Sequence, residues 1–246
     1  MRVVVFSGTT EGRLFSKQLA ALGANVLVSV ATPLGAEEQG DFAGITVHCG
    51  RLTIEEMQQL LQGADLCIDA THPYAVDATK NICAACRAAG MEYHRLLRAQ
   101  SPLPSGSMVF DSAAHAAEFL AGTQGNILLA TGAKELPQFA KITPDRLFPR
   151  VLPTQEGIAA CEAAHIPHKN ILALQGPFTY ALNRALLEQF HIHFLVTKDG
   201  GAAGGFAEKA QAAADTGTQL IVVRRPAETG ETAEQILVRC KEVLQQ

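Results

Sequence analysis

The densest group of chemically useful side chains in this sequence is Asp69, Thr71, His72 and Tyr74. A histidine can hold or release a proton near neutral pH, and a tyrosine adds a phenol and a flat face for stacking. Pro73 restricts the backbone between them. Because the group directly follows an apolar run, it predicts a polar functional site at the end of a buried strand. The alternative interpretation is a helix N-cap with a structural histidine.

A second group, residues 7–13, follows the first apolar run and reads Ser-Gly-Thr-Thr-Glu-Gly-Arg. Gly8 lets the backbone approach a ligand closely, and the next helix would offer unpaired N–H groups and its positive dipole end to a phosphate. Ser7, Thr9 and Thr10 add hydroxyl donors. The spacing differs from G-x-G-x-x-G, and a tight turn with a helix cap is the other interpretation. Its place after the first strand favours a nucleotide or phosphate site.

Positive side chains follow several other apolar runs, namely Arg51, Lys134, Lys198 and Arg224. Each of them alone is typical of a solvated surface charge. Their shared placement on an acidic chain argues for an anionic ligand, which lysine and arginine side chains can hold. Glycines lie close to several of these positions and would free the backbone to wrap such a ligand.

The elements that must position these groups alternate between strand and helix along the chain. We expect strands at 3–6, 26–30, 45–47, 66–68, 92–96, 126–130, 147–151, 171–174, 194–197 and 220–223. We expect helices at about 12–22, from 53 onward, and at 76–89, 112–121, 155–164, 179–190, 206–215 and 232–244. This alternation predicts an α/β protein with two doubly wound parallel-sheet domains. In such sheets ligands bind beyond the carboxyl ends of the strands, where all the groups above would lie.

A polar, proline-containing stretch, 98–107, predicts the linker between the two domains. The expected domains are therefore residues 1–98, which carry the dinucleotide-binding loop, and residues 108–246. A chain of 246 residues is long enough for this arrangement.

Composition excludes several classes of function. The net charge is −4, which does not suit a protein that binds nucleic acid through its overall field. No apolar stretch approaches the roughly 20 residues that span a bilayer, and no signal peptide is visible, so we expect a cytoplasmic protein without a membrane partner. The six cysteines would stay thiols there. Cys83 and Cys86 have the spacing of a redox or zinc pair, but their alanine-rich helical setting favours buried packing.

In six motifs taken together, the chain resembles the precorrin-6A reductase family of cobalamin biosynthesis, including its cobalt-precorrin-6A branch. The motifs are residues 8–13, 50–52, 69–75, 131–134, 175–178 and 197–205. They occur in the family's order and span nearly the whole chain, with Asp199 standing where the family pattern leads us to expect serine. The resemblance implies two Rossmann-like domains with NADPH or NADH in the cleft between them. It also implies hydride transfer to a ring carbon of an anionic tetrapyrrole, with protonation of the neighbouring carbon.

With this resemblance we assign expected roles. The cofactor would be bound by Gly8, Thr9, Thr10, Glu11, Arg13, Lys134 and Gly176. The reacting centre would be lined by the catalytic candidates Thr71, His72 and Tyr74. His72 is the first candidate for the proton donor, with water or the substrate's own acidity as alternatives. The acidic groups of the substrate would be held by Arg51, Lys198, Gly201 and Arg224. No set of metal ligands is visible, so any cobalt would belong to the substrate.

Two other functions fit the same pattern. One is a methyltransferase or phosphate-sugar enzyme on a doubly wound fold, and the other is a non-catalytic sensor that binds a dinucleotide. The sequence does not choose between NADH and NADPH, because neither an acidic residue nor an arginine follows the second strand. It also leaves open whether the substrate contains cobalt, and we expect a monomer or a weak homo-oligomer.

Overall fold

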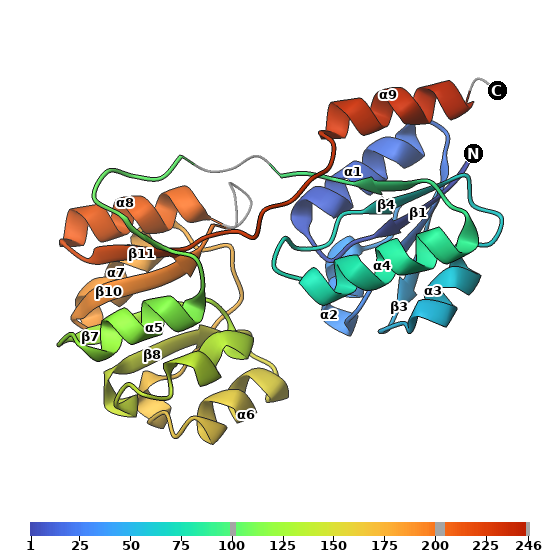
Figure 1. The fold of residues 1–246 in the computed structure, drawn as a ribbon. Coiled ribbons are helices and arrows are strands. Elements are labelled where there is room, and N and C mark those ends of the chain that lie inside the picture. Colours follow the sequence, from blue (N-terminus) through green and yellow to red (C-terminus); the bar gives the residue numbers. More distant parts are fainter. Residues whose placement is uncertain (99–101, 200–204, 245–246) are drawn as a thin grey trace. The chain divides into compact units, whose positions relative to one another are not determined.

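The computed structural model describes residues 1–98, 102–199 and 205–244, which form two compact units (Figure 1). Unit 1 comprises Met1–Arg98 and Pro226–Gln246, and unit 2 comprises Ala99–Arg225. Each unit is a parallel sheet with helices on its faces, so the expected α/β fold class is confirmed. The expected domain division is wrong in one respect, because the last segment of the chain returns to unit 1.

Unit 1 contains a five-stranded parallel sheet in the order β3-β2-β1-β4-β5. Its strands are β1 (Arg2–Phe6), β2 (Asn25–Val30), β3 (Ile45–Cys49), β4 (Leu66–Asp69) and β5 (Tyr93–Arg95). Its helices are α1 (Thr10–Ala21), α2 (Pro33–Gln39), α3 (Ile54–Leu60), α4 (Val76–Ala89) and α9 (Ala233–Leu244). The short helix α2 was not expected from the sequence.

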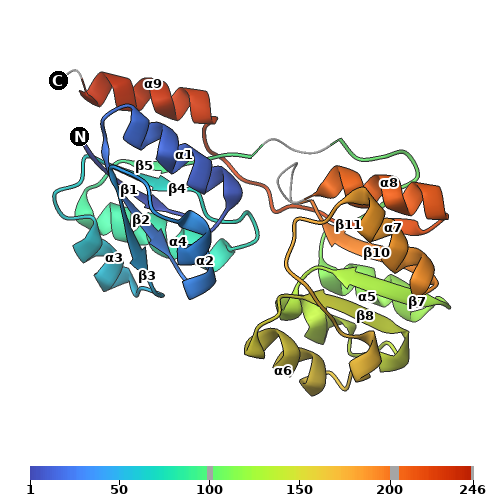
Figure 2. The same ribbon diagram turned by 180° about the vertical axis from the view of Figure 1, so that it is seen from behind.

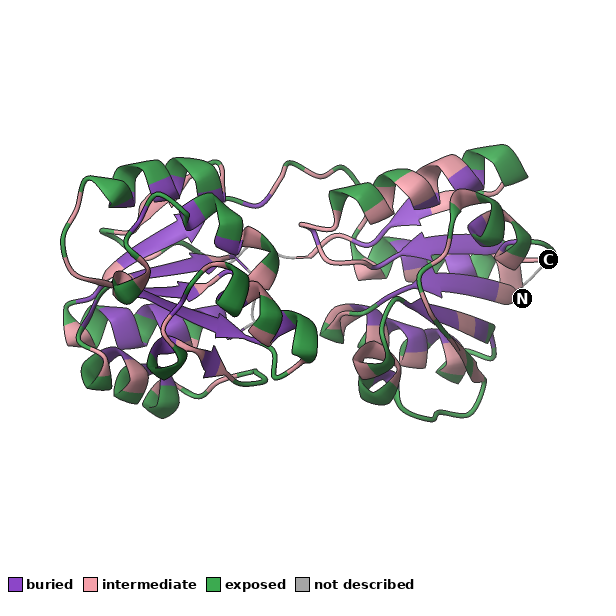
Figure 3. Ribbon diagram, turned by 90° about the horizontal axis from the view of Figure 1, so that it is seen from below, coloured by how far each residue is buried: buried purple, intermediate pink, exposed green. Residues whose placement is uncertain are grey.

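The central strand β1 is apolar throughout because helices cover both faces of the sheet. Val3 packs in a core cluster with Phe15 of α1, whereas Val4 belongs to the cluster on the opposite face under α3 and α4. Figure 3 shows the buried strands in purple between helices whose outer surfaces are exposed.

The position of α9 explains the corrected domain division. Ile236 and Cys240 are both fully buried, and they pack in the same cluster as Val3 and Phe15. In Figures 1 and 2, α9 lies beside α1. The segment before α9 also pairs with the end of β5, through the bond from the Leu97 amide to the Glu231 carbonyl, 2.8 Å long. These contacts join residues far apart in sequence, so local periodicity could not reveal them.

Unit 2 contains a six-stranded parallel sheet in the order β6-β11-β10-β7-β8-β9. The strands are β6 (Met108–Phe110), β7 (Asn126–Ala130), β8 (Leu147–Val151), β9 (Leu172–Ala173), β10 (Ile192–Lys198) and β11 (Gln219–Val223). The helices are α5 (Ala113–Ala121), α6 (Gln155–Ala163), α7 (Tyr180–Gln189) and α8 (Phe206–Thr216), with 3₁₀ turns η1 (Ala133–Phe139), η2 (Pro144–Arg146) and η3 (His168–Asn170). Strand β6 was missed in the sequence because it has only three residues.

Two further sequence expectations concern the helices. Cys86 of α4 is 1% exposed and packs in the core, as expected from the alanine-rich pattern around it. No helix among the described residues is long and apolar enough to cross a membrane.

Candidate active site

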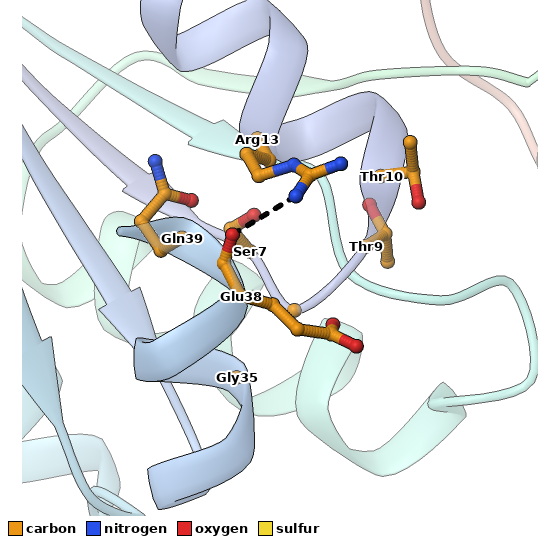
Figure 4. A pocket seen from close by; sticks show the side chains of 8 residues that line it. Ser7, Thr9, Thr10, Arg13, Gly35, Glu38 and Gln39 are labelled. Carbon is orange, nitrogen blue, oxygen red and sulfur yellow. Dashed lines mark hydrogen bonds between the residues drawn. The ribbon is translucent and has the colours of Figure 1, made fainter. Parts of the chain in front are cut away.

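A small pocket opens at the carboxyl end of β1, between the loop that follows this strand and helix α2 (Figure 4). It is lined by Ser7, Gly8, Thr9, Thr10, Arg13, Gly35, Glu38 and Gln39. Gly8 has a φ of 109°, and a Cβ atom there would meet nothing within 4 Å, so the backbone is accessible at this point. Nη1 of Arg13 donates a hydrogen bond of 3.0 Å to the Glu38 carbonyl, which holds the guanidinium at the pocket wall.

The loop is fixed by the residue that caps α1. Thr9 is extended at the N-cap, and its hydroxyl accepts a hydrogen bond of 3.0 Å from the Gly12 amide. The same hydroxyl donates to the Ala70 carbonyl at 2.9 Å, which ties the loop after β1 to the loop after β4. A Cβ atom on Gly12 would lie 2.5 Å from Ser7 Oγ and 3.0 Å from Ala70 Cβ. Glycine is therefore required for α1 to begin so close to the two strand ends.

The pocket has the donors that a phosphate group needs. Ser7 Oγ and Gln39 Nε2 are buried, and neither has a hydrogen-bond partner among the described residues. An unpaired buried polar atom costs the fold about 1–3 kcal/mol, so such atoms commonly serve a ligand. Together with the positive dipole end of α1, they fit the phosphate of a dinucleotide.

Of the residues expected to bind the cofactor in unit 1, Gly8, Thr9, Thr10 and Arg13 line the pocket, but Glu11 does not. The Glu11 carboxylate instead pairs with Nη2 of Arg98 at 2.9 Å. Local patterns do not indicate this partner, because Arg98 lies in the stretch predicted to be the linker.

The loop after β4 is built on a buried charge network. Asp69 is fully buried, and its carboxylate accepts hydrogen bonds from Thr71 Oγ1 at 2.7 Å and Tyr93 OH at 3.0 Å. Nη1 of Arg95 completes the set at 2.6 Å, and Nε of Arg95 also donates to Glu228 at 2.9 Å. Burial and the nearby Asp69 charge raise the pKa of Tyr93. Asp69 therefore holds three neighbouring side chains in place through its carboxylate.

This network accounts for Thr71, whereas His72 and Tyr74 are half-buried and contact each other further along the loop. The Thr71 hydroxyl donates to Asp69 and accepts from Arg95 at 3.0 Å, so it holds the loop in shape. His72 Nδ1 accepts a hydrogen bond of 3.3 Å from the Tyr74 amide, and the two rings lie 5.4 Å apart. Because Nδ1 must present a lone pair to that amide, the proton of a neutral His72 ring resides on Nε2.

Sequence reasoning missed Tyr93, Arg95 and Glu228. A signal for a cation did exist, because a carboxylate at the end of an apolar strand requires a partner, and Arg95 ends the next strand of the sheet. No comparable signal existed for Glu228, which reaches Arg95 from 133 residues further along the chain.

The positive residues expected to bind anions have different surroundings. Arg51 is exposed in unit 1, and Lys134 is exposed on η1 of unit 2. Lys198 pairs with Glu135 at 2.7 Å, and Arg224 pairs with Asp111 at 3.0 Å on the surface. Gly176 precedes the cis peptide bond to Pro177. Gly201 lies outside the described residues.

The structure thus brings together the loops after β1 and β4, which were expected to bind the cofactor and to line the reacting centre. The two parallel-sheet units and the glycine-bearing loop at the start of α1 define a Rossmann-like α/β protein. The family model for precorrin-6x reductase CbiJ/CobK matches residues 2–245. The chain belongs to this family.

Individual relatives agree with the family. The chain is 36% identical over 233 residues to the cobalt-precorrin-6A reductase of Salmonella typhimurium, covering 91% of this chain and 87% of the relative. It is 34% identical over 231 residues to the cobalt-precorrin-6A reductase of Priestia megaterium, covering 91% and 90%. It is 31% identical over 235 residues to the precorrin-6A reductase of Mycobacterium tuberculosis, covering 92% of this chain and 89% of the relative.

A solved structure shows the same fold. The structure of CobK precorrin-6A reductase superimposes with a TM-score of 0.80 at 25% sequence identity and covers 98% of this chain and 97% of that chain.

Proposed function

We propose that this protein reduces precorrin-6A, in its metal-free or its cobalt-containing form, with NADPH or NADH as the hydride source. The observation that carries the proposal is the match of the precorrin-6x reductase family model to residues 2–245. Relatives that cover nine-tenths of the chain include reductases named for both forms of the substrate, which supports the reaction but leaves the form open.

The pocket after β1 supports the cofactor part of the proposal. Gly8 leaves room for a phosphate, Ser7 Oγ supplies a donor without a partner among the described residues, and the N-terminus of α1 adds its positive dipole end. Arg13 adds a positive charge at the wall of the same pocket. A bound nicotinamide supplies the hydride that the macrocycle receives at a ring carbon.

The loop after β4 supports a site for proton delivery. Asp69, held by Arg95 and Thr71, fixes the backbone from which His72 projects. His72 holds its proton on Nε2, because Nδ1 accepts the Tyr74 amide. We propose that His72 first takes up a proton on Nδ1, in place of the long contact of 3.3 Å from the Tyr74 amide. The resulting imidazolium gives its Nε2 proton to the ring carbon next to the site of reduction and returns to a neutral ring.

The substrate carries many carboxylate side chains, and positive residues orient such groups by charge-assisted hydrogen bonds. Arg51 is an exposed residue that no described residue pairs with, so it is available to a substrate carboxylate. Lys198 and Arg224 are paired within unit 2 and would have to exchange a protein carboxylate for one of the substrate.

The test is anaerobic absorbance at the NAD(P)H band, with precorrin-6A or cobalt-precorrin-6A added to the full chain and each cofactor supplied separately. Oxidation that depends on both reactants is expected, and the fastest of the four combinations identifies the cofactor and the substrate form. Folded protein that oxidises neither cofactor with either substrate contradicts the proposal. Binding of a dinucleotide without turnover in that experiment favours the sensor function instead.

A further inference from the structure

Unit 2 buries an arginine that has no carboxylate partner. Arg150, near the carboxyl end of β8, is 7% exposed. Its guanidinium lies 4.1 Å from the centroid of the Phe178 ring, and Nη1 donates a hydrogen bond of 2.9 Å to Oδ1 of Asn183. Asn183 is held in turn by bonds to the carbonyls of Phe178 and Thr179. The ring and the amide therefore fix the orientation of Arg150, while its other N–H groups have no hydrogen-bond partner among the described residues.

A buried lysine lies close to this arginine. Lys209, in the first turn of α8, is also 7% exposed, and its ammonium makes no hydrogen bond to any residue that the structure describes. Burial, and after it the positive charge of Arg150, lower the pKa of Lys209 to about 8. Gly205, directly before α8, lies against Phe178, because a Cβ atom there would be 3.6 Å from the Phe178 carbonyl oxygen. The start of α8 therefore neighbours the ring that packs on Arg150, and two buried cations lie near the carboxyl end of the sheet, where parallel-sheet proteins bind ligands.

The acidic residues nearby do not balance these two charges. Glu208 and Asp199 both act on Lys209 and favour its charged form. Asp199, however, is paired with Arg225 at 3.3 Å. One carboxylate, Glu208, thus remains for two buried cations, and its Oε2 atom has no hydrogen-bond partner among the described residues. Buried charges are costly unless they are paired, so this pair of cations suits an external anion.

We propose that Arg150 and Lys209 together bind one carboxylate side chain of the macrocycle. The inference rests on the proposed function and adds two residues that the sequence did not identify as ligand-binding. The planar edge of the arginine can take both carboxylate oxygens, and the lysine adds a point charge to one of them. The phosphate of the dinucleotide is the other anion of similar chemistry, but the buried donors that suit it lie in unit 1, at Ser7 and Gln39.

The experiment uses the full chain with Lys209→Met, Arg150→Met and the charge-retaining variant Lys209→Arg. The matched control is Lys141→Met, because Lys141 is an exposed lysine of the same unit. Steady-state kinetics give kcat and KM for the macrocycle, and equilibrium titration gives the dissociation constant of the dinucleotide. Thermal unfolding checks each variant. Lys209→Met should not lower the melting temperature, since an apolar side chain of similar size replaces a buried charge.

The two methionine variants should each raise the KM for the macrocycle at least tenfold, with kcat within threefold and dinucleotide affinity within twofold of the wild type. Lys209→Arg should stay within threefold in KM, and Lys141→Met should match the wild type. If the KM for the macrocycle is unchanged in both methionine variants and the wild type turns over normally, the proposed carboxylate site at Arg150 and Lys209 is wrong, and the proposed function stands. Weakened dinucleotide binding with unchanged KM for the macrocycle overturns it in favour of a cofactor phosphate. Wild-type protein that neither binds nor reduces the macrocycle overturns the proposed function as well.

Discussion

Units 1 and 2 both bring charged side chains to the carboxyl ends of a parallel sheet, but they treat the buried charge differently. In unit 1 the carboxylate of Asp69 is matched by Arg95, which is itself shared with Glu228. In unit 2, Arg150 is held by a neutral amide and an aromatic ring, and Lys209 makes no hydrogen bond to the described residues. In unit 1 the protein's own residues therefore complete the charge network, because Asp69, Arg95 and Glu228 pair with one another. In unit 2 the described residues do not complete it, and the anion that we propose would do so.

The largest expected effect tests whether proton delivery belongs to unit 1. Replacing His72 by Ala should lower kcat about 100-fold and change the KM for the macrocycle little, because a positioned acid contributes about that much. His72→Gln is the matched control, since it keeps a donor and an acceptor but cannot transfer a proton. Unchanged turnover of His72→Ala at every pH removes His72 from the mechanism, and full activity of His72→Gln reduces its role to hydrogen bonding.

The next effect tests the claim that the charges of unit 1 are structural. Asp69→Ala leaves Arg95 buried with one carboxylate fewer, and it should lower the free energy of unfolding of unit 1 by about 3 kcal/mol. Urea denaturation measures this change. The control is Asp111→Ala, which breaks the exposed pair with Arg224 and should cost about 0.5 kcal/mol or less. Equal losses in the free energy of unfolding would show that the buried network contributes no more to stability than an exposed ion pair does.

A third effect, opposite in sign, tests the buried lysine of unit 2. Because the pKa of Lys209 is lowered to about 8, the unfolded chain binds more protons than the folded chain between about pH 8 and the ordinary lysine pKa. The free energy of unfolding should therefore rise with pH across this window, by up to about 3 kcal/mol from this residue. Lys209→Met should lack this rise and be more stable than the wild type at pH 7. If the free energy of unfolding changes with pH in the same way in both proteins, the pKa of Lys209 is not lowered in the folded chain.

The smallest effect tests whether the pocket of unit 1 holds unpaired donors for a ligand. Ser7→Ala should weaken dinucleotide binding about tenfold and leave the melting temperature unchanged, because Ser7 Oγ has no partner among the described residues. Ser16→Ala is the control. Ser16 Oγ donates to the Gly12 carbonyl at 2.7 Å in the same helix, so its loss should lower stability by about 1 kcal/mol without changing affinity. The opposite pattern would place Ser7 in the fold and not in the binding site.

The fold was largely predictable because its signals are local. Ten of the eleven strands in the described part of the chain, and most of its helices, correspond to apolar runs and helical periodicity within a few residues. The misses have physical reasons. Strand β6 is a short apolar run directly after the polar, proline-containing stretch, and α2 (PLGAEEQ) contains Pro33 and Gly35 and lacks an apolar helical period. The wrong domain boundary came from α9, whose amphipathic pattern predicts a helix but cannot say which sheet its buried face will cover.

The candidate site was predictable to the same extent. The glycines and hydroxyl residues after β1 indicated a phosphate pocket, because backbone freedom and helix N-termini are properties of the local sequence. The loop from Asp69 to Tyr74 is predicted to be functional, but local patterns do not separate the role of Thr71 from that of His72. Thr71 is held by hydrogen bonds to Asp69 and Arg95, and Arg95 is bonded in turn to Glu228. The contacts of Arg95 join distant segments, so local patterns could not predict them.

By itself the sequence determined the fold class, the strand ends at which ligand-binding groups gather, and the family to which they point. Only the tertiary structure decided which of those groups are already paired within the protein. In the fold, Arg98 forms an ion pair with Glu11, and Glu228 forms one with Arg95. Arg150 and Lys209 are both buried in unit 2. The reason is that periodicity and turn chemistry act over a few residues, whereas charge pairing depends on distances of a few ångströms between segments far apart in the chain.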